Sequence, residues 1–176
     1  MNVNIITIEK LYNDSHQELF PLDNPNEHFG FGTAGISCFS GTCNLLLRQF
    51  ILADNSCLLN QSGASVKPDP RFIRYVWALA KKSNSCLIDF HTHPFSDKNV
   101  CFSCIDDRSE YESFPKVVEY LGQGPHASIV FGRNSLDARW YDPKTKILKP
   151  VLEIRILGEK LVKIIPTSSK KAKPNS

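Results

Sequence analysis

The sequence lacks any apolar run that approaches the ~20 residues needed to cross a bilayer. Residues 1–8 have neither the length nor the basic start of a secretory signal. Internal repeats are absent as well, and 176 residues lie within the usual range of one domain with one core. We therefore expect a single cytoplasmic domain with no membrane partner.

Most of the chain also lacks an excess of charge of either sign. The formal net charge is +3 at pH 7, and segment 167–176 accounts for all of it, because it holds three lysines and no acidic residue. The balanced remainder offers no basic surface for nucleic acid, which we do not expect as a partner. We expect residues 1–166 to form the folded domain and residues 167–176 to be a disordered basic tail.

The six cysteines lack the arrangement of a disulfide framework or of a structural zinc site. The chain is neither short nor marked for export, so most of its cysteines are expected to be buried thiols. Cys101 and Cys104 form a CxxC pair, but a four-ligand zinc site needs a second pair. Cys38 and Cys43 flank a turn-like segment, and nothing else in the sequence favours a disulfide between them.

Three residues of metal-binding type lie close together in the middle of the chain. Residues 86–90 are largely apolar and predict a buried strand, so His91 and His93 project to one face at its end. Ser103 is a favourable N-cap, and Asp106 falls in the first turn of the helix that Ser103 begins. His91, His93 and Asp106 suit one zinc ion per chain and leave a fourth position for water, whose pKa zinc lowers to about 7.

This pattern resembles a family of metalloproteases. His-Thr-His-Pro at residues 91–94, followed by Ser-x-x-Asp at residues 103–106, resembles the JAMM (MPN+) proteins, which include deubiquitinases and bacterial peptidases that act on ubiquitin-like proteins. The family usually has seven residues between the second His and the Ser, whereas nine, 94–102, lie there in this sequence. The resemblance covers roughly residues 27–141 and is specific at a glutamate and at these two motifs.

The resemblance also implies two catalytic residues. The family needs a glutamate ahead of a glycine-rich apolar segment, and Glu27 precedes such a segment at residues 28–32. Glu27 would act as the general base that takes a proton from zinc-bound water and returns one to the leaving amine. Glu9 and Glu18 are the alternatives, although both adjoin or lie in a predicted helix where carboxylates are more often solvated. Ser103 would stabilise the oxyanion of the tetrahedral intermediate, a role worth ~3 kcal/mol.

The remaining histidines are expected to have ordinary structural roles. His28 adjoins the candidate base and is interpreted as a wall or surface residue. His16 lies in a polar helix, and His126 precedes a predicted strand. A further hypothesis is that a disulfide between Cys101 and Cys104 would strain the helix start and stop activity, but two ordinary loop thiols are the favoured interpretation.

Patterning predicts an alternation of helices and strands. Helices are expected over residues 8–19, from residue 70 with Asp69 as N-cap, and from Ser103 toward residue 121 with a break at Pro115. Strands are expected over residues 29–37, 44–52, 86–90, 126–131, 136–141, 147–156 and 161–165. This order predicts a single-domain α/β fold, with a mixed curved sheet flanked by two main helices. The resemblance implies the JAMM/MPN, cytidine-deaminase-like sandwich.

The resemblance implies a zinc-dependent metalloprotease or isopeptidase that cleaves the C-terminal peptide or isopeptide bond of a ubiquitin-like protein. The substrate would lie as an extended strand along a sheet edge. Expected partners are the ubiquitin-like protein, its conjugates, and E1-like and E2-like enzymes of a bacterial conjugation or antiviral system. Two alternatives stay open, namely a noncatalytic MPN-type interaction subunit and a zinc hydrolase that acts on a sulfur-carrier protein adduct.

Overall fold

The computed structural model describes residues 1–21, 24–122 and 124–171. Within these residues, a nine-stranded mixed sheet, a separate two-stranded hairpin and four α-helices form one α/β domain. The sheet strands are β1 (Asn2–Ile8), β2 (Phe29–Phe39), β3 (Thr42–Leu52), β6 (Cys86–Thr92), β7 (His126–Phe131), β8 (Leu136–Asp142), β9 (Ile147–Pro150), β10 (Glu153–Leu157) and β11 (Leu161–Ile164). The hairpin strands are β4 (Leu58–Ser62) and β5 (Ser65–Pro68), which follow a short 3-10 helix, Asn55–Cys57. The helices are α1 (Glu9–Leu19), α2 (Pro70–Lys82), α3 (Cys104–Leu121) and α4 (Thr167–Lys171).

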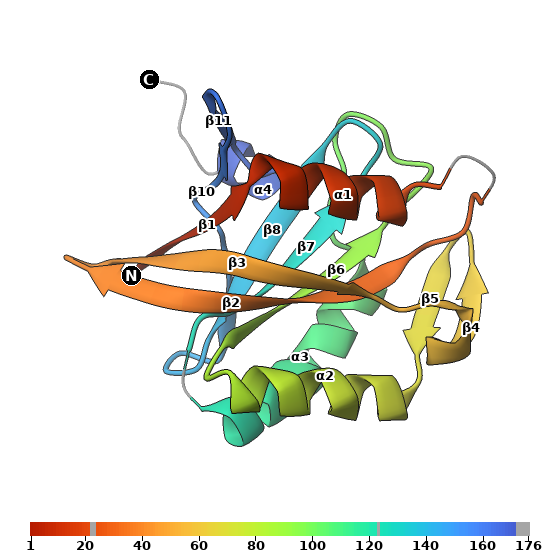
Figure 1. The fold of residues 1–176 in the computed structure, drawn as a ribbon, viewed down its shortest axis with the longest axis horizontal. Helices are drawn as coiled ribbons and strands as arrows, with labels where there is room; N and C mark the ends of the chain where they lie inside the picture. The colour runs from red at the N-terminus through yellow and green to blue at the C-terminus, as the bar shows by residue number, and fades with distance from the viewer. Residues whose placement is uncertain (22–23, 123, 172–176) are drawn as a thin grey trace.

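β6 lies in the middle of the sheet, whose strand order is β11-β10-β1-β3-β2-β6-β7-β8-β9. It runs antiparallel to β2 and parallel to β7. α1 covers one face of the sheet, and α2 and α3 cover the other (Figure 1). No helix in the described part of the chain is long and apolar enough to cross a membrane. The predicted α/β class and mixed sheet are confirmed, and the three predicted helices correspond to α1, α2 and α3, whereas α4 was not expected.

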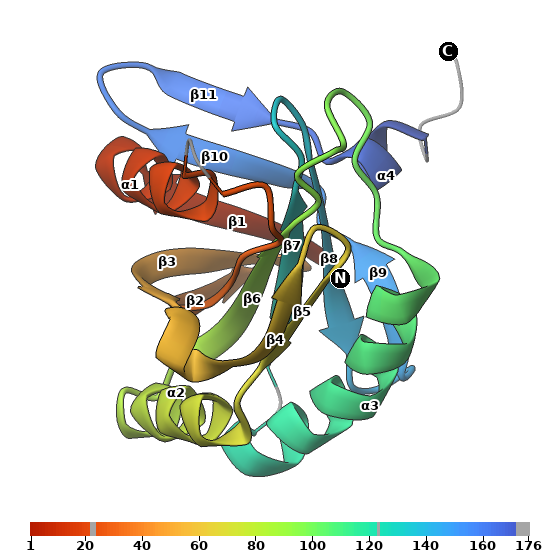
Figure 2. The same cartoon turned by 90° about the vertical axis from the view of Figure 1, so that its right-hand side faces the viewer.

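The sheet curls so that strands distant in its order approach each other (Figure 2). Two consecutive residues bridge them, because the Val151 N–H donates to the Ala138 carbonyl of β8 at 2.9 Å and the Leu152 N–H donates to the Val3 carbonyl of β1 at 2.8 Å. The passage of the chain from β8 to β1 at these two residues ends β9 and begins β10. The single strand predicted over residues 147–156 is therefore wrong, and β9 and β10 lie in different parts of the sheet.

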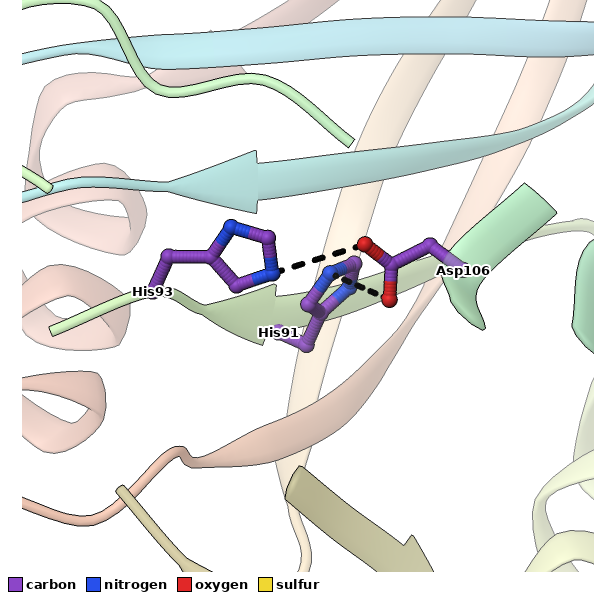
Figure 3. Close-up of side chains that lie close together, drawn as sticks. All are labelled: His91, His93 and Asp106. Atoms are coloured by element: carbon purple, nitrogen blue, oxygen red, sulfur yellow. Dashed lines mark ion pairs between the residues drawn. The ribbon is translucent and has the colours of Figure 1, made fainter. Parts of the chain in front are cut away.

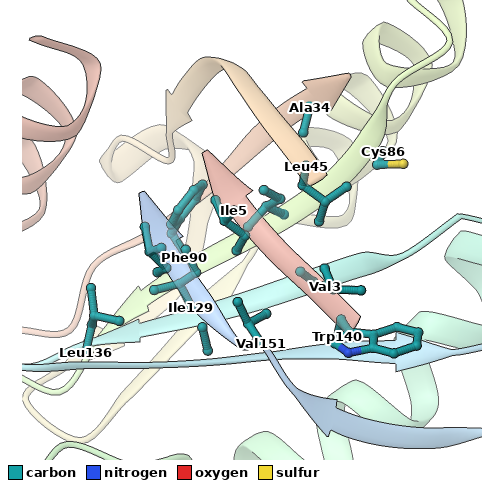
Figure 4. Close-up of a cluster of buried hydrophobic side chains, with 14 of the residues drawn as sticks. Val3, Ile5, Ala34, Leu45, Cys86, Phe90, Ile129, Leu136, Trp140 and Val151 are labelled. Carbon is teal, nitrogen blue, oxygen red and sulfur yellow. The ribbon is translucent and has the colours of Figure 1, made fainter. Parts of the chain in front are cut away.

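β6 contributes side chains to both apolar cores. Phe90 lies in the core beneath α1 (Figure 4), and so does Ile88. Leu87 lies in the core beneath α2 and α3. Successive side chains of a strand point to opposite faces, so Asp89 and His91 share the face of Leu87. The polar residues of β6 therefore face the α2 and α3 side of the sheet.

α2 begins as its sequence predicts. The Asp69 side chain accepts a hydrogen bond from the Arg71 N–H at 2.6 Å, and Pro70 occupies the first helical position, where its missing N–H costs nothing. Phe72 and Val76 are buried against the sheet. This apolar stripe places α2 beside β6.

α3 is continuous, and the predicted break at Pro115 is wrong. Proline in a helix interior removes one hydrogen bond and costs about 3 kcal/mol. The neighbouring side chains offset this cost, since Phe114 stacks on Tyr141 with 5.7 Å between ring centroids and Val117 is buried in the core beneath α2 and α3. Tertiary packing therefore outweighs the local preference.

The expectation that Cys38 and Cys43 do not form a disulfide is also wrong. Ser40 and Gly41 have φ values of 46° and 80°, the backbone of a two-residue hairpin turn. This turn makes Cys38 and Cys43 direct cross-strand partners, with 4.0 Å between their Cα atoms. Among the four free cysteines only Cys86 is buried, so the expectation of mostly buried thiols is wrong as well.

Three ordered segments were not expected from the sequence. β1 pairs in parallel with both β3 and β10, and the β4–β5 hairpin precedes α2. α4 occupies the start of the predicted disordered tail, where Thr167 and Ser169 are buried and their hydroxyls donate to the carbonyls of Leu136 and Val151. The tail prediction is thus wrong for these five residues, and residues 172–176 lie outside the described part.

Candidate metal centre

The structure brings the three predicted metal ligands together (Figure 3). His91 Nε2 lies 3.3 Å from Asp106 Oδ1, and His93 Nε2 lies 3.4 Å from Asp106 Oδ2. One ligand-type atom from each residue lies within 4.8 Å of the other two. We call these three residues the triad.

The two histidines are positioned by strands on both sides of β6. His91 is the cross-strand partner of Phe29 on β2 and of Val130 on β7. Beyond the end of β6, the His93 N–H still donates to the Phe131 carbonyl of β7 at 2.8 Å. The backbone of both imidazoles is therefore fixed by the sheet.

A capping box positions Asp106 at the start of α3. Asp106 Oδ2 accepts a hydrogen bond from the Ser103 N–H at 2.6 Å, and Ser103 Oγ accepts one from the Asp106 N–H at 3.2 Å. This reciprocal pair satisfies two free donors of the helix start. It leaves Asp106 Oδ1 beside His91, and it leaves the Ser103 hydroxyl proton available to another acceptor.

The donor set and its surroundings fit a zinc ion. His91 Nε2 is buried, and its approach to Asp106 Oδ1 lacks the geometry of a hydrogen bond, so this nitrogen has no hydrogen-bond partner among the described residues. Buried polar atoms are rarely left without a partner, and a metal ion would bind this one. Burial alone would raise the pKa of the Asp106 carboxyl, but the adjoining His91 and His93 rings lower it below its ordinary value. Two imidazoles and one ionised carboxylate, with space for a fourth ligand, form a set that zinc enzymes use.

Glu27 is the fourth polar group at the site, and its Oε1 lies 3.9 Å from His93 Nε2. Its backbone is held by the hairpin, because its N–H donates to the Ser62 carbonyl at 2.7 Å and its carbonyl accepts from Gln61 Nε2 at 2.9 Å. Burial raises the pKa of the Glu27 carboxyl, and the nearby His93 and His91 rings only partly offset this effect. A carboxyl group with a raised pKa accepts a proton more readily than a solvated one, as a general base must.

The alternatives to Glu27 lie elsewhere. Glu9 and Glu18 are exposed on α1, which covers the opposite face of the sheet from α2 and α3 (Figure 1). His16 also belongs to α1, where its ring packs 4.9 Å from that of Phe20. Only Glu27 among these acidic candidates is brought to the triad.

The other two histidines are buried in structural positions. His126 Nδ1 accepts a hydrogen bond from the Leu87 N–H at 3.0 Å. The His28 N–H donates to the hydroxyl of Thr92 at 2.8 Å, and His28 lies outside the triad. Both positions agree with the wall or structural roles expected from the sequence.

The turn between β7 and β8 anchors the long loop between His93 and Ser103. Arg133 Nε donates to the Pro94 carbonyl at 2.9 Å. The Ser135 hydroxyl donates to the Asp97 carbonyl at 2.7 Å and accepts from the Val100 N–H at 3.0 Å. The extra length of this loop therefore leaves the Ser-to-Asp capping box intact.

Sequence reasoning missed a buried polar cluster next to the triad. Arg139 Nε donates to Glu110 Oε2 at 2.7 Å, and Arg139 also pairs with Asp107. Asp89 lies on the same face of β6 as His91, and burial raises the pKa of its carboxyl. An acid within the apolar run 86–90 was the available signal, because strand interiors seldom contain unpaired acids.

The fold class that this architecture defines is a mixed α/β domain with a curled nine-stranded sheet. A similar solved structure is the solution structure of protein DSY2949 from Desulfitobacterium hafniense, with a TM-score of 0.55 and 16% sequence identity over 88% of this chain and 94% of that chain. At this identity the likeness shows the fold alone. No family model and no curated protein matches the sequence.

Proposed function

We propose that this protein is a zinc-dependent peptidase or isopeptidase that cleaves at the C-terminus of a ubiquitin-like protein. The observation that carries the proposal is the convergence of the triad, from β6 and α3, with Glu27, from the segment before β2. Three zinc ligands with a nearby carboxylate that is not itself needed as a ligand are the composition of a hydrolytic zinc site.

Each polar group of the site has a distinct role in this proposal. His91, His93 and Asp106 would hold the ion, which supplies Lewis acidity and activates water for attack on a carbonyl group. Glu27 accepts the proton of the attacking water and transfers it to the leaving amine. The Ser103 oxygen already accepts a hydrogen bond from the Asp106 N–H. Its hydroxyl would donate a hydrogen bond to the substrate carbonyl oxygen, which becomes negative in the tetrahedral intermediate.

The ubiquitin-like substrate rests on the resemblance to the JAMM (MPN+) family in the motifs at residues 91–94 and 103–106. The finer fold assignment, a JAMM/MPN sandwich, and E1-like and E2-like partners in the cytoplasm belong to the same proposal. The β4–β5 hairpin supports a substrate bound as an extended strand. Its two strands pair with each other alone, and Ser65 and Val66 line the cavity beside the triad.

Zinc content tests the first half of the proposal. We expect about one zinc per chain in the purified protein and almost none in His93→Ala, since the triad loses one of three ligands. His16→Ala is the matched control, because this histidine lies on α1, away from the triad. Zinc measured by mass spectrometry at equal levels in His93→Ala and the unmodified protein would refute the triad as the site.

A cleavage assay tests the second half of the proposal, which is hydrolysis at the C-terminus of a ubiquitin-like protein. A panel of ubiquitin-like proteins, each with a reporter fused after its C-terminus, is incubated with the zinc-loaded protein, and the products are identified by mass. We expect cleavage at the end of at least one of these domains and none with His93→Ala. A protein that holds zinc but cleaves no fusion would favour the noncatalytic interaction subunit.

A further inference from the structure

A cavity of about 190 Å³ extends from the triad between the sheet and helices α2 and α3. Apolar side chains, among them Phe31, Trp77 and Leu87, form much of its wall. Besides Glu27, two acidic residues outside the triad, Asp89 and Glu110, also line it. A cavity of about 150 Å³ is large enough for benzene, so this space suffices for one long side chain.

Asp89 belongs to a row of polar residues that crosses three strands. The register pairs Asp89 with Ser128 on β7, and Ser128 with Arg139 on β8. Asp89 Oδ1, Ser128 Oγ and Arg139 Nη2 are each buried without a hydrogen-bond partner among the described residues. Buried polar atoms are rarely left without a partner. Asp89 Oδ1 and Ser128 Oγ are able to accept a hydrogen bond from a ligand, whereas Arg139 Nη2 only donates.

The charges of this cluster are unequal. Arg139 forms ion pairs with Asp107 and Glu110, and Asp89 is the third carboxylate beside it. Burial raises the pKa of both Asp89 and Glu110, and a cation that lies beside these carboxyl groups favours their ionised forms. The carboxyl groups outnumber the single guanidinium in a partly dehydrated space, where a neighbouring cation is attracted more strongly than in water. A cation that enters the cavity would meet the carboxyl groups of Asp89 and Glu110.

The distance along β6 between Asp89 and His91 sets the length of a suitable ligand. Asp89 precedes His91 by two residues on the same face of the strand, which corresponds to roughly 6.6 Å. The four methylene groups of a lysine side chain span roughly 6 Å when extended. A substrate whose scissile carbonyl lies at the triad can thus place a long side chain along the apolar wall, with its charged end at Asp89.

We propose that this cavity binds a cationic side chain, lysine or arginine, of the substrate residue next to the scissile bond, with its charge against Asp89 and Glu110. This inference rests on the peptidase function proposed above and names a determinant of its specificity. Residues with neutral or acidic side chains at that position would be poorer substrates.

The test uses two small zinc-binding compounds of equal shape, 6-aminohexanohydroxamic acid and heptanohydroxamic acid. Both present a hydroxamate followed by five methylene groups, and only the first ends in an ammonium group. We expect the amine to bind the zinc-loaded protein more tightly by on the order of tenfold, as measured by calorimetry. A hydroxamate that ends in a guanidinium group distinguishes a preference for arginine from one for lysine.

Asp89→Asn and Glu110→Gln each replace an ionisable carboxyl group by an amide with little change of shape, and either should move the affinity ratio toward one. Asp107→Asn is the matched control, because Asp107 pairs with the same arginine but does not line the cavity. A purely structural role for the cluster predicts that Asp107→Asn and Glu110→Gln change the ratio equally. The cavity predicts a large change only for the residues that line it.

The outcomes separate the two proposals. Equal affinities of the amine and the neutral compound for the zinc-loaded protein would overturn the cationic cavity and leave the peptidase proposal standing. Failure of every hydroxamate to bind the zinc-loaded protein would show that the cavity does not open to the triad, which also overturns the inference. A protein that holds no zinc would refute the proposed function itself and this inference with it.

Discussion

Glu27 is held at the triad by its backbone, through the Ser62 carbonyl and the Gln61 side chain. The side chain can therefore be changed without loss of the contacts that position it. For Glu27→Gln we expect zinc content to stay unchanged and the cleavage rate to fall by about 10²–10⁴, the usual contribution of a general base. Rates are measured on a cleaved fusion, with Glu18→Gln on α1 as the control.

An unchanged rate for Glu27→Gln would mean that another group accepts the proton. A parallel loss of zinc would instead make Glu27 a ligand. Both readings contradict the role proposed for it.

Ser103 combines two roles, since its oxygen caps α3 and its hydroxyl proton is free for the substrate. Ser103→Ala should lower stability by about 1 kcal/mol through the lost cap, whereas Ser103→Gly should cost only a few tenths. Both should slow cleavage by about 10²–10³ if the hydroxyl stabilises the oxyanion. Urea unfolding and cleavage rates are measured on the same samples.

The pair of variants separates the two roles of this residue. Rates that follow the loss of stability, with Ser103→Gly almost fully active, would reduce Ser103 to a helix cap.

Local spacing predicted His91, His93, Asp106 and the cap at Ser103, because a strand end and a helix start are short-range features. The proximity of Glu27 to the triad followed from resemblance alone, since it depends on hairpin contacts far along the chain. The polar cluster was missed for the same reason. Its members come from three strands and α3, and a sequence does not display their register.

At the scale of elements, α3 contains a proline that its packing tolerates. Pro115 is exposed, so Pro115→Ala exchanges a missing hydrogen bond for a regular helical residue without altering the core. We expect the variant to be more stable by about 1–3 kcal/mol in urea unfolding, with an unchanged cleavage rate. Lower stability would mean that the proline ring itself contributes packing. Lys116→Ala, at the next exposed position, serves as the control.

The start of α3 also holds the exposed thiols of Cys101 and Cys104. A disulfide between them would have to form across the capping box, so we expect the same cleavage rate in reducing and mildly oxidising buffer. The Cys38–Cys43 disulfide, at the far end of β2 from Phe29, is not expected to matter for this rate. A loss on oxidation that Cys101→Ser abolishes, and Cys38→Ser does not, would establish the redox switch.

Helices whose first residues carry a clear N-terminal signal were predicted well. Strands whose bounds depend on pairing with residues far along the chain were not. Asp69 and Pro70 identify the start of α2 within the local sequence. By contrast, the division between β9 and β10 arises because Val151 and Leu152 bond to different strands. The Cys38–Cys43 pairing was accessible from the two-residue turn, whose register makes these residues partners.

At the scale of the whole molecule, α4 connects the end of the described chain to β8 and to the β9–β10 crossing. A chain that ends at residue 166 loses the hydroxyl contacts of Thr167 and Ser169 and exposes the surface they cover. We expect it to be less stable by about 2–4 kcal/mol than a chain that ends at residue 171. Thermal and urea unfolding measure the difference. Equal stability would show that α4 adds no net packing energy.

Composition and pattern sufficed to predict a mixed α/β domain. Segments with the apolar periodicity of helices alternate with segments typical of strands, and such an order requires a sheet with helices packed against it. The curl of the sheet could not be predicted from the sequence. It depends on β1, which the sequence analysis did not expect as a strand and which nevertheless pairs on both sides.

The pairing of β1 with β10 has a consequence for how the protein is made. Asn4 lies opposite Glu153, so one edge of β1 stays unpaired until β10, the tenth of the eleven described strands, has been synthesised. Strands β1, β3, β2 and β6 are able to associate during synthesis, while that open edge remains a template for strands of other chains. Pairing at such long sequence separation also slows folding. Newly made molecules should therefore depend on chaperones until residues 151–157 have been synthesised.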